Sequence, residues 1–186
     1  MRLRGKQHIQ SVPGLSTRPT SARVREAIFN IWQFEIAGCR WLDLCAGTGA
    51  MGAEALCRNA SVVVGIEQSK QACTVVRQNW ERMAQPHQQI RVIQADVRRG
   101  LDLLADQQFE RIYFDPPYAS DLYLPTLEVI AQRNRLADTG ILAVEHDRSR
   151  ILPQQVGSLQ QLQVRHYGKT AITFYQRELA PAKDIP

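Results

Sequence analysis

Short apolar runs alternate with amphipathic segments from residue 41 to residue 145, and this rhythm constrains the fold more than any other feature. The runs that read as strands are 41–45, 62–66, 90–94, 111–114 and 141–145. Between them the apolar spacing predicts helices at 50–58, 70–83, about 101–104 and 123–132. Strands that alternate with helices form a mostly parallel sheet covered by helices on both faces.

The segments on either side of this region depart from the rhythm. A helix is predicted from Thr20 to a point before Gly38, and segments 162–167 and 171–175 read as a hairpin that adds an antiparallel strand. We therefore predict one Rossmann-like α/β domain with a seven-stranded, mostly parallel sheet. The expected division is a basic arm at 1–22, the domain at 23–177 and a loose tail at 178–186.

Composition excludes several classes of protein. The 186 residues suffice for one domain with a buried core, and no apolar run is long enough to span a membrane. The first residues lack the apolar stretch of a secretory signal, so we expect a cytoplasmic protein. The four cysteines and four histidines show no metal-ligand spacing, and we expect free thiols and no metal.

Positive charge is concentrated at the start of the chain. The first 25 residues hold six of the 23 basic residues and none of the 18 acidic ones, which leaves the remainder at −1. A solvated tail is one interpretation, and an arm that binds a polyanion such as RNA or DNA is the other. The candidate nucleic-acid-binding residues are Arg2, Arg4, Lys6, Arg18, Arg23 and Arg25.

A glycine-rich loop follows the first predicted strand. Residues 42–52 read LDLCAGTGAMG, in which Gly47, Gly49 and Gly52 match the G-x-G-x-x-G pattern of dinucleotide-binding loops. An NAD-dependent oxidoreductase is therefore one hypothesis, although the chain has no room for a separate substrate domain. Asp43, an acid just inside the strand, suits the cationic amine and sulfonium of S-adenosylmethionine better than a pyrophosphate.

Acidic residues also end the later strands. In such sheets ligands bind beyond the carboxyl ends of the strands, where Glu67 could accept from ribose hydroxyls and Asp96 from the adenine amine. Four carboxylates converging on one rim favour S-adenosylmethionine as the cofactor. The predicted cofactor-binding residues are Asp43, Ala46, Gly47, Gly49, Glu67 and Asp96.

The fourth strand ends in Asp-Pro-Pro-Tyr at 115–118. The prolines restrict the backbone, so the Asp115 carboxylate and the Pro116 carbonyl can both accept hydrogen bonds from the exocyclic amine of a base. Tyr118 would stack on that base, and these three residues form the predicted catalytic set. No cysteine lies between Cys73 and the C-terminus, which favours an amine over a ring carbon as the methyl acceptor.

These motifs, with RPTSARVREAIFN at 18–30, resemble the class I S-adenosylmethionine-dependent methyltransferases of the DPPY group, and more narrowly the RsmD-like family, over the chain to about residue 175. The resemblance implies methylation of N2 of a guanine in 16S ribosomal RNA, either as naked RNA or in an assembling small subunit. It implies that Arg2, Arg4 and Lys6 meet phosphates, while Arg18, Arg23 and Arg25 serve either RNA or the cofactor carboxylate.

Adenine N6 methylation of DNA or RNA and a non-catalytic RNA-binding module are the alternatives, and we expect a monomer. At Ser21-Ala22 the family often has Thr-Asp, and Arg4-Gly5-Lys6 replaces a more arginine-rich segment.

Overall fold

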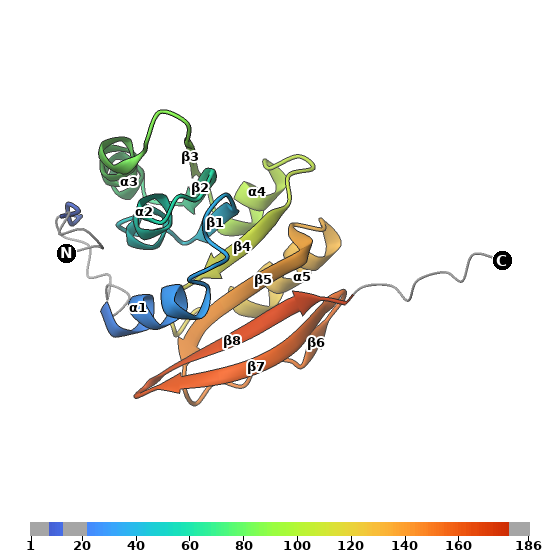
Figure 1. Cartoon of the computed structure of the whole chain (residues 1–186). Helices are drawn as coiled ribbons and strands as arrows, with labels where there is room; N and C mark the ends of the chain where they lie inside the picture. Colours follow the sequence, from blue (N-terminus) through green and yellow to red (C-terminus); the bar gives the residue numbers. More distant parts are fainter. Residues whose placement is uncertain (1–7, 13–21, 179–186) are drawn as a thin grey trace.

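The computed structural model describes residues 8–12 and 22–178, and its centre is a single eight-stranded sheet (Figure 1). The strands lie in the order β3-β2-β1-β4-β5-β8-β7-β6. The first five strands pair in parallel, and β8, β7 and β6 extend the sheet in antiparallel fashion. Their bounds are β1 Arg40–Leu44, β2 Val62–Glu67, β3 Gln89–Gln94, β4 Phe109–Phe114, β5 Leu136–Asp147, β6 Gln155–Val156, β7 Leu159–Tyr167 and β8 Thr170–Arg177.

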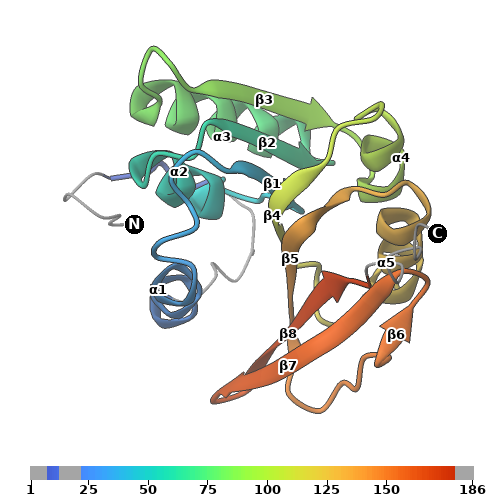
Figure 2. The same ribbon diagram turned by 45° about the vertical axis from the view of Figure 1, so that its right-hand side comes forward.

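Five helices cover the two faces of this sheet (Figure 2). Helices α1, α2 and α3 pack on one face, where Trp41, Trp80 and Phe174 belong to one buried cluster. Helices α4 and α5 pack on the other face around Phe114 and Leu127. The helix bounds are α1 Ala22–Ile31, α2 Ala50–Cys57, α3 Lys70–Met83, α4 Val97–Asp102 and α5 Tyr123–Gln132.

The predicted α/β class and the mostly parallel sheet are confirmed, but the strand count was one too low. The additional strand is the two-residue β6, which pairs with β7 and is too short to leave a pattern in the sequence. Strand β5 begins five residues earlier than predicted, because the polar Asp138-Thr139-Gly140 stretch interrupts its apolar run. A register shift between Phe109 and Arg111 accommodates that stretch beside β4.

The strand order reverses at β1, which lies between β2 and β4. Loops that leave β1 and β4 at their carboxyl ends therefore diverge to opposite faces of the sheet and open a crevice between them. The glycine loop follows β1 and the Asp-Pro-Pro-Tyr segment follows β4, so the topology brings these two motifs together.

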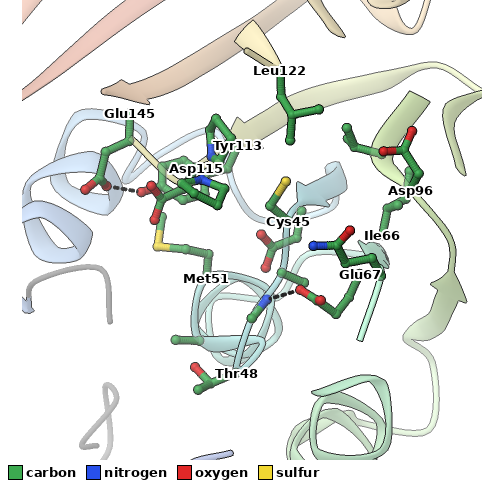
Figure 3. Close-up of a pocket in the computed structure, with 18 of the residues that line it drawn as sticks. Cys45, Thr48, Met51, Ile66, Glu67, Asp96, Tyr113, Asp115, Leu122 and Glu145 are labelled. Carbon is green, nitrogen blue, oxygen red and sulfur yellow. Dashed lines mark hydrogen bonds between the residues drawn. The ribbon is translucent and has the colours of Figure 1, made fainter. Parts of the chain in front are cut away.

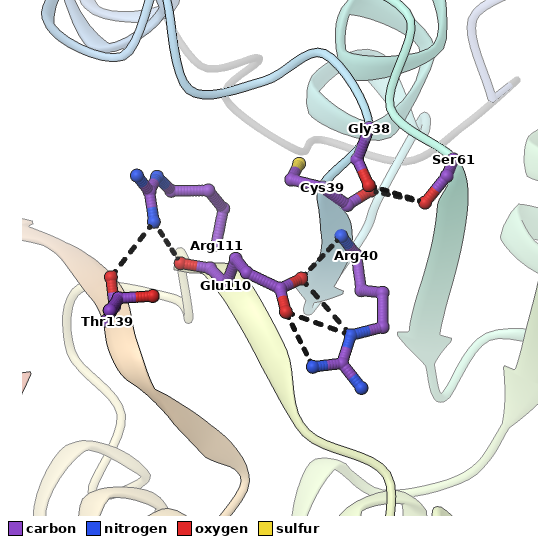
Figure 4. Close-up of polar contacts among 7 residues, drawn as sticks. All are labelled: Gly38, Cys39, Arg40, Ser61, Glu110, Arg111 and Thr139. Atoms are coloured by element: carbon purple, nitrogen blue, oxygen red, sulfur yellow. Dashed lines mark hydrogen bonds and ion pairs between the residues drawn. The ribbon is translucent and has the colours of Figure 1, made fainter.

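The opposite, amino end of the parallel strands is closed by arginine contacts (Figure 4). The Arg40 guanidinium donates to both oxygens of Glu110, with an Nη2–Oε1 distance of 2.5 Å, and links β1 to β4. Arg111 is buried, donates to the carbonyl of Glu110 and pairs with Glu35. These contacts are structural and lie away from the crevice.

The described part of the predicted arm, residues 8–12, packs on the domain. Ile9 and Val12 are buried, with exposed fractions of 6% and 7%. The side-chain amide of Asn79 in α3 accepts from the backbone N–H of Gln10 at 2.8 Å and donates to its carbonyl at 3.1 Å. Residues 8–12 of the predicted arm therefore pack against the domain through apolar side chains, and the division at residue 22 stays a prediction. Within 8–12 and 22–178, no helix has the length and apolar character that crossing a membrane requires.

Candidate active-site cavity

A cavity of about 460 Å³ lies at the carboxyl ends of the parallel strands (Figure 3). It receives residues from the ends of β1, β2, β3, β4 and β5, so the sheet itself positions its walls. The residues that line it are Asp43, Cys45, Ala46, Gly47, Thr48, Ala50, Met51, Ile66, Glu67, Gln68, Ala95, Asp96, Val97, Tyr113, Asp115, Pro116, Pro117, Tyr118, Leu122 and Glu145.

The glycine loop is fastened to the end of β2 by Glu67. One carboxylate oxygen of Glu67 accepts from the backbone N–H of Gly47 at 2.9 Å, and the other accepts from that of Ser69 at 2.8 Å. The backbone N–H of Ala46 donates to the carbonyl of Ile66 at 3.1 Å. Each carboxylate oxygen retains a second lone pair, so Glu67 shapes the loop and can still accept from a ligand.

Gly49 and Gly52 pack closely against Trp80. A Cβ on Gly49 would lie 2.7 Å from Nε1 of Trp80, and one on Gly52 would lie 2.2 Å from Cζ2 of the same ring. The indole N–H of Trp80 donates to the carbonyl of Gly49 at 2.8 Å. Gly49 packs closely against the buried Trp80 and is not among the residues that line the cavity, and its contact with the cofactor stays a prediction.

Asp43 is an acid held in a buried wall of the cavity. Its exposed fraction is 2%, and its carboxylate accepts from the backbone N–H of Gly52 at 3.0 Å. The pKa of Asp43 is raised to about 8, mainly by burial and to a lesser extent by the nearby Glu67, against the lowering effect of the Gly52 hydrogen bond. A bound cation would stabilise the ionised form of this buried acid.

The acceptors of the cavity fit S-adenosylmethionine. Asp43 offers an acid to a cationic group, Glu67 ends β2, and Asp96 lies beyond β3 at the start of α4. Asp96 is half-buried, accepts from the backbone N–H of Arg98 at 3.1 Å and is paired with its guanidinium at 3.4 Å. Carboxylates spaced over three neighbouring strands match the amine, ribose hydroxyls and adenine amine of that molecule.

The Asp-Pro-Pro-Tyr segment forms the facing wall. All four of its residues line the cavity, with Asp115 half-buried and Pro116 buried. The Arg150 guanidinium donates to the carbonyl of Tyr118 at 3.0 Å and lies over the ring of Tyr123, 4.4 Å from its centroid. The loop that carries the predicted catalytic residues is therefore held in place from outside the cavity.

Glu145, at the end of β5, is a cavity residue that our sequence reasoning missed. Its exposed fraction is 4%, and it accepts from the hydroxyls of both Tyr113 and Tyr118, the latter at 2.9 Å. The Tyr118 hydroxyl also lies 2.9 Å from that of Thr170, the first residue of β8. Burial raises the pKa of Tyr118, and Glu145 raises it further, so the phenol keeps its proton and remains a donor. The signal that could have revealed Glu145 is its position at the carboxyl end of a parallel strand, the same signal that identified the other acids.

Cys45 contributes a thiol to the cavity. Its backbone adopts a positive φ of 62°, which turns the chain from β1 into the glycine loop. Burial raises the pKa of Cys45, and the negative charges of Glu67, Asp115, Asp43 and Asp96 raise it further. The thiol stays protonated and is a poor nucleophile.

The predicted nucleic-acid-binding arginines and lysine are not brought together in the described structure. Arg2, Arg4, Lys6 and Arg18 lie outside the described residues, and Arg23 is exposed at the start of α1. Arg25 is buried, and its Nε lies 3.9 Å from Glu54 of α2. The guanidinium therefore lies between two helices, and its contact with RNA or the cofactor stays a prediction.

Solved structures identify the class to which this fold and cavity belong. The yhhF protein of Escherichia coli, a candidate methyltransferase, superimposes with a TM-score of 0.80 at 28% identity, over 97% of this chain and 99% of that one. A hypothetical protein of Thermus thermophilus gives a TM-score of 0.76 at 25% identity, over 91% and 93%. The switch-point cavity, its glycine loop and its strand-end acids are those of a Rossmann-like methyltransferase.

Sequence relatives specify the family. The family model described as Conserved hypothetical protein 95 matches residues 2–176. YlbH of Bacillus subtilis is 33% identical over 171 residues, which are 91% of this chain and 92% of that protein. Ribosomal RNA small subunit methyltransferase D of Escherichia coli is 29% identical over 96% of this chain and 88% of its own length. The chain belongs to the Conserved hypothetical protein 95 family, the family of RsmD-like methyltransferases.

Proposed function

We propose that the protein transfers a methyl group from S-adenosylmethionine to the exocyclic N2 amine of a guanine in 16S ribosomal RNA. The observation that carries the proposal is the placement of Asp115 and Pro116 across one cavity from the buried acid Asp43. The ribosomal substrate is supported by the Escherichia coli relative, which is named a ribosomal RNA small subunit methyltransferase. The protein would act as a cytoplasmic monomer.

S-adenosylmethionine, when bound, supplies an electrophilic methyl group. Asp43 would hold its positive charge, Glu67 its ribose and Asp96 its adenine amine. Gly47 lets the backbone approach the bound molecule, since its φ of 55° is one that residues with a side chain seldom adopt. Burial of Asp43 excludes water and so strengthens the attraction between the carboxylate and the cation.

Asp115 and Pro116 would make the amine reactive. The lone pair of an exocyclic amine is delocalised into the base, and two fixed acceptors favour the pyramidal geometry in which positive charge develops on nitrogen. Preorganised groups of this kind contribute factors of about 10²–10³ in rate. Tyr118 would stack on the base, which contributes about 1–3 kcal/mol in single-stranded complexes.

The protonated state of Cys45 supports an amine rather than a ring carbon as the acceptor. Methylation of a pyrimidine ring carbon needs a thiolate nucleophile, and the carboxylates around Cys45 oppose its ionisation. Adenine N6 is also an exocyclic amine, so it is the alternative acceptor within the same chemistry.

The target nucleotide must leave its stack to reach the cavity between Tyr118 and the cofactor. A nucleotide in a loop unstacks at lower cost than one in a helix, so a loop guanine is the expected target. The basic residues Arg2, Arg4 and Lys6 would contact phosphates around it.

The test is substitution of Asp115 by alanine, with Asp121→Asn as the matched control, because Asp121 is an exposed acid on the same loop. We expect D115A to keep nearly the wild-type affinity for S-adenosylhomocysteine in calorimetric titration and to lose methyl transfer to 16S ribosomal RNA. D121N should keep both. Mass spectrometry of nucleosides from the modified RNA distinguishes N2-methylguanosine from N6-methyladenosine. Equal losses of cofactor affinity and transfer in D115A would contradict the catalytic role.

A further inference from the structure

Basic residues gather where the loop after β5 meets the turn between β7 and β8. Because β5 and β8 are antiparallel, with Asp147 opposite Thr170, this loop and turn lie at the same end of the sheet as the cavity. The backbone N–H of Arg148 donates to the carbonyl of Lys169 at 2.9 Å, which fixes the loop against the turn. Arg150 belongs to the same loop and Arg165 lies in β7 shortly before the turn, and we call these four residues the C-terminal basic edge: Arg148, Arg150, Arg165 and Lys169.

Two contacts connect this edge to Tyr118. Arg150 donates to the Tyr118 carbonyl at 3.0 Å, and Thr170, next to Lys169, lies 2.9 Å from the Tyr118 hydroxyl. Tyr118 lines the cavity, so the C-terminal basic edge borders its wall. A nucleic acid whose base stacks on Tyr118 would bring its backbone near these segments.

The charges of this edge are available to a ligand. Arg148, Arg165 and Lys169 are exposed and Arg150 is half-buried. Seven arginines in the described part of the chain lie within 4.0 Å of a carboxylate, and none of the four is among them.

Acidic residues offset only part of this local charge: hydrogen bonds from Ser149 lower the pKa of Asp147, and its electrostatic interaction with Lys169 helps to lower it. The neighbouring acid Asp147 uses one oxygen to accept from the backbone N–H and the hydroxyl of Ser149, at 2.9 and 2.6 Å. Glu145 is buried and accepts from two tyrosines. The chain beyond its first 25 residues carries a net charge of only −1. The four cations of the edge lie beside two acids, the half-buried Asp147 and the exposed Asp121, and so form a local excess of positive charge.

We propose that the C-terminal basic edge binds the phosphates of the RNA on either side of the nucleotide whose base enters the cavity. It is a second RNA contact, separate from the basic residues at the start of the chain, and it rests on the function proposed above. Lysine and arginine that neutralise phosphates release counterions, so binding through them weakens as salt rises. The position of the edge beside Tyr118 gives the backbone a fixed path past the cavity.

The experiment is filter binding of unmodified, in vitro-transcribed 16S ribosomal RNA to the full chain between about 50 and 300 mM salt. R148Q/K169Q removes two exposed charges from the edge. R91Q/R99Q removes two exposed charges from β3 and α4, and R148K/K169R keeps both charges at the edge. Each lost phosphate contact changes the slope of log K against log salt by about 0.7 for single-stranded RNA. We expect R148Q/K169Q to make the slope less negative by about 1.4 and to weaken binding at about 0.1 M salt by about 25-fold.

The two controls should keep the wild-type slope, and S-adenosylhomocysteine affinity should be unchanged in all three variants because none of the substituted residues lines the cavity. A wild-type slope in R148Q/K169Q, or an equal change in R91Q/R99Q, overturns the proposal. Methyl transfer by the wild type is measured separately with the same RNA. If it is absent while R148Q/K169Q still changes the slope, the proposed methylation fails and the binding edge stands.

Discussion

The hydrogen bond from Tyr118 to Glu145 should couple the energetics of two residues that are 27 positions apart. Tyr118→Phe removes the hydroxyl and keeps the ring, whereas Glu145→Gln keeps the shape and removes the charge. A hydrogen bond of this kind contributes about 1–3 kcal/mol, the range that spans neutral and charged acceptors. E145Q should cost at least as much as Y118F, because Glu145 also accepts from Tyr113. When Tyr118 is already phenylalanine, the E145Q substitution should cost about 1–3 kcal/mol less than it costs in the wild type, because the hydrogen bond is already lost.

Urea unfolding followed by tryptophan fluorescence measures the free energy of unfolding of the four proteins in this comparison: the wild type, Y118F, E145Q and the double variant. The control is Tyr175→Phe, which removes another buried hydroxyl, one that donates to the carbonyl of Pro153 at 2.7 Å. Tyr175 lies three residues from the partner of Glu145 on β8, a separation of about 10 Å, so Y175F and E145Q should be additive. Additivity of Y118F and E145Q within about 0.5 kcal/mol would refute the reasoning that this hydrogen bond holds Tyr118.

Three further predictions concern packing and charge. Gly65→Ala should lower the free energy of unfolding by about 1–3 kcal/mol, because its Cβ would lie 2.6 Å from the buried ring of Trp80; an unchanged midpoint of thermal unfolding would contradict this packing. The pKa of Asp43 is raised to about 8 in the folded state, so the unfolded state releases this proton first as pH rises. Relative to D43N, the wild type should therefore lose stability by about 1.4 kcal/mol per pH unit between about pH 5 and 8 and level off above, as urea titrations at each pH would measure. Burial raises the pKa of Glu110, but hydrogen bonds from Arg40 lower it more, so the net lowering stabilises the fold near neutral pH and is lost in acid. Because the Arg40 side chain is 42% exposed, E110Q should cost less than about 1 kcal/mol at pH 7, and a larger loss in calorimetry would contradict this.

The sequence predicted most of the parallel half of the fold well because most of its elements have a strong local pattern; the exception is the short helix predicted at about 101–104, since α4 spans Val97–Asp102. Helices α3 and α5 have the predicted bounds, since their apolar residues recur at helical spacing without interruption. The additional strand β6 was missed because two residues carry no periodicity. Its pairing with β7 is a tertiary contact, and tertiary contacts determine such short strands.

The acids that end parallel strands were the easiest cavity residues to find from the sequence, and their predicted roles stay predictions. Asp43, Glu67, Asp96 and Asp115 do line one cavity, and the same rule applied to β5 would have included Glu145. A glycine pattern cannot distinguish contact with a ligand from contact with Trp80, and so Gly49 was assigned to the cofactor.

Arg25 was predicted to contact RNA or the cofactor, but helical spacing marks its position as buried. The residues three, four and seven positions later are Ile28, Phe29 and Trp32, and all three are in the core. Residue type suggested a surface contact, and the periodicity of α1 was the better guide.

The strand order determines how the sheet can assemble while the chain is being synthesised. Strand β7 leaves the ribosome before β8, yet β8 is the strand that separates β7 from β5. The nascent chain can therefore form the parallel strands before β8 is made, while β6 and β7 still lack the strand that joins them to the sheet. A chain truncated before Thr170 would keep every acid on β1, β2 and β4, but Tyr118 would lack one of its two hydroxyl partners. The last strand made thus completes the hydrogen bonding around Tyr118 in the cavity wall.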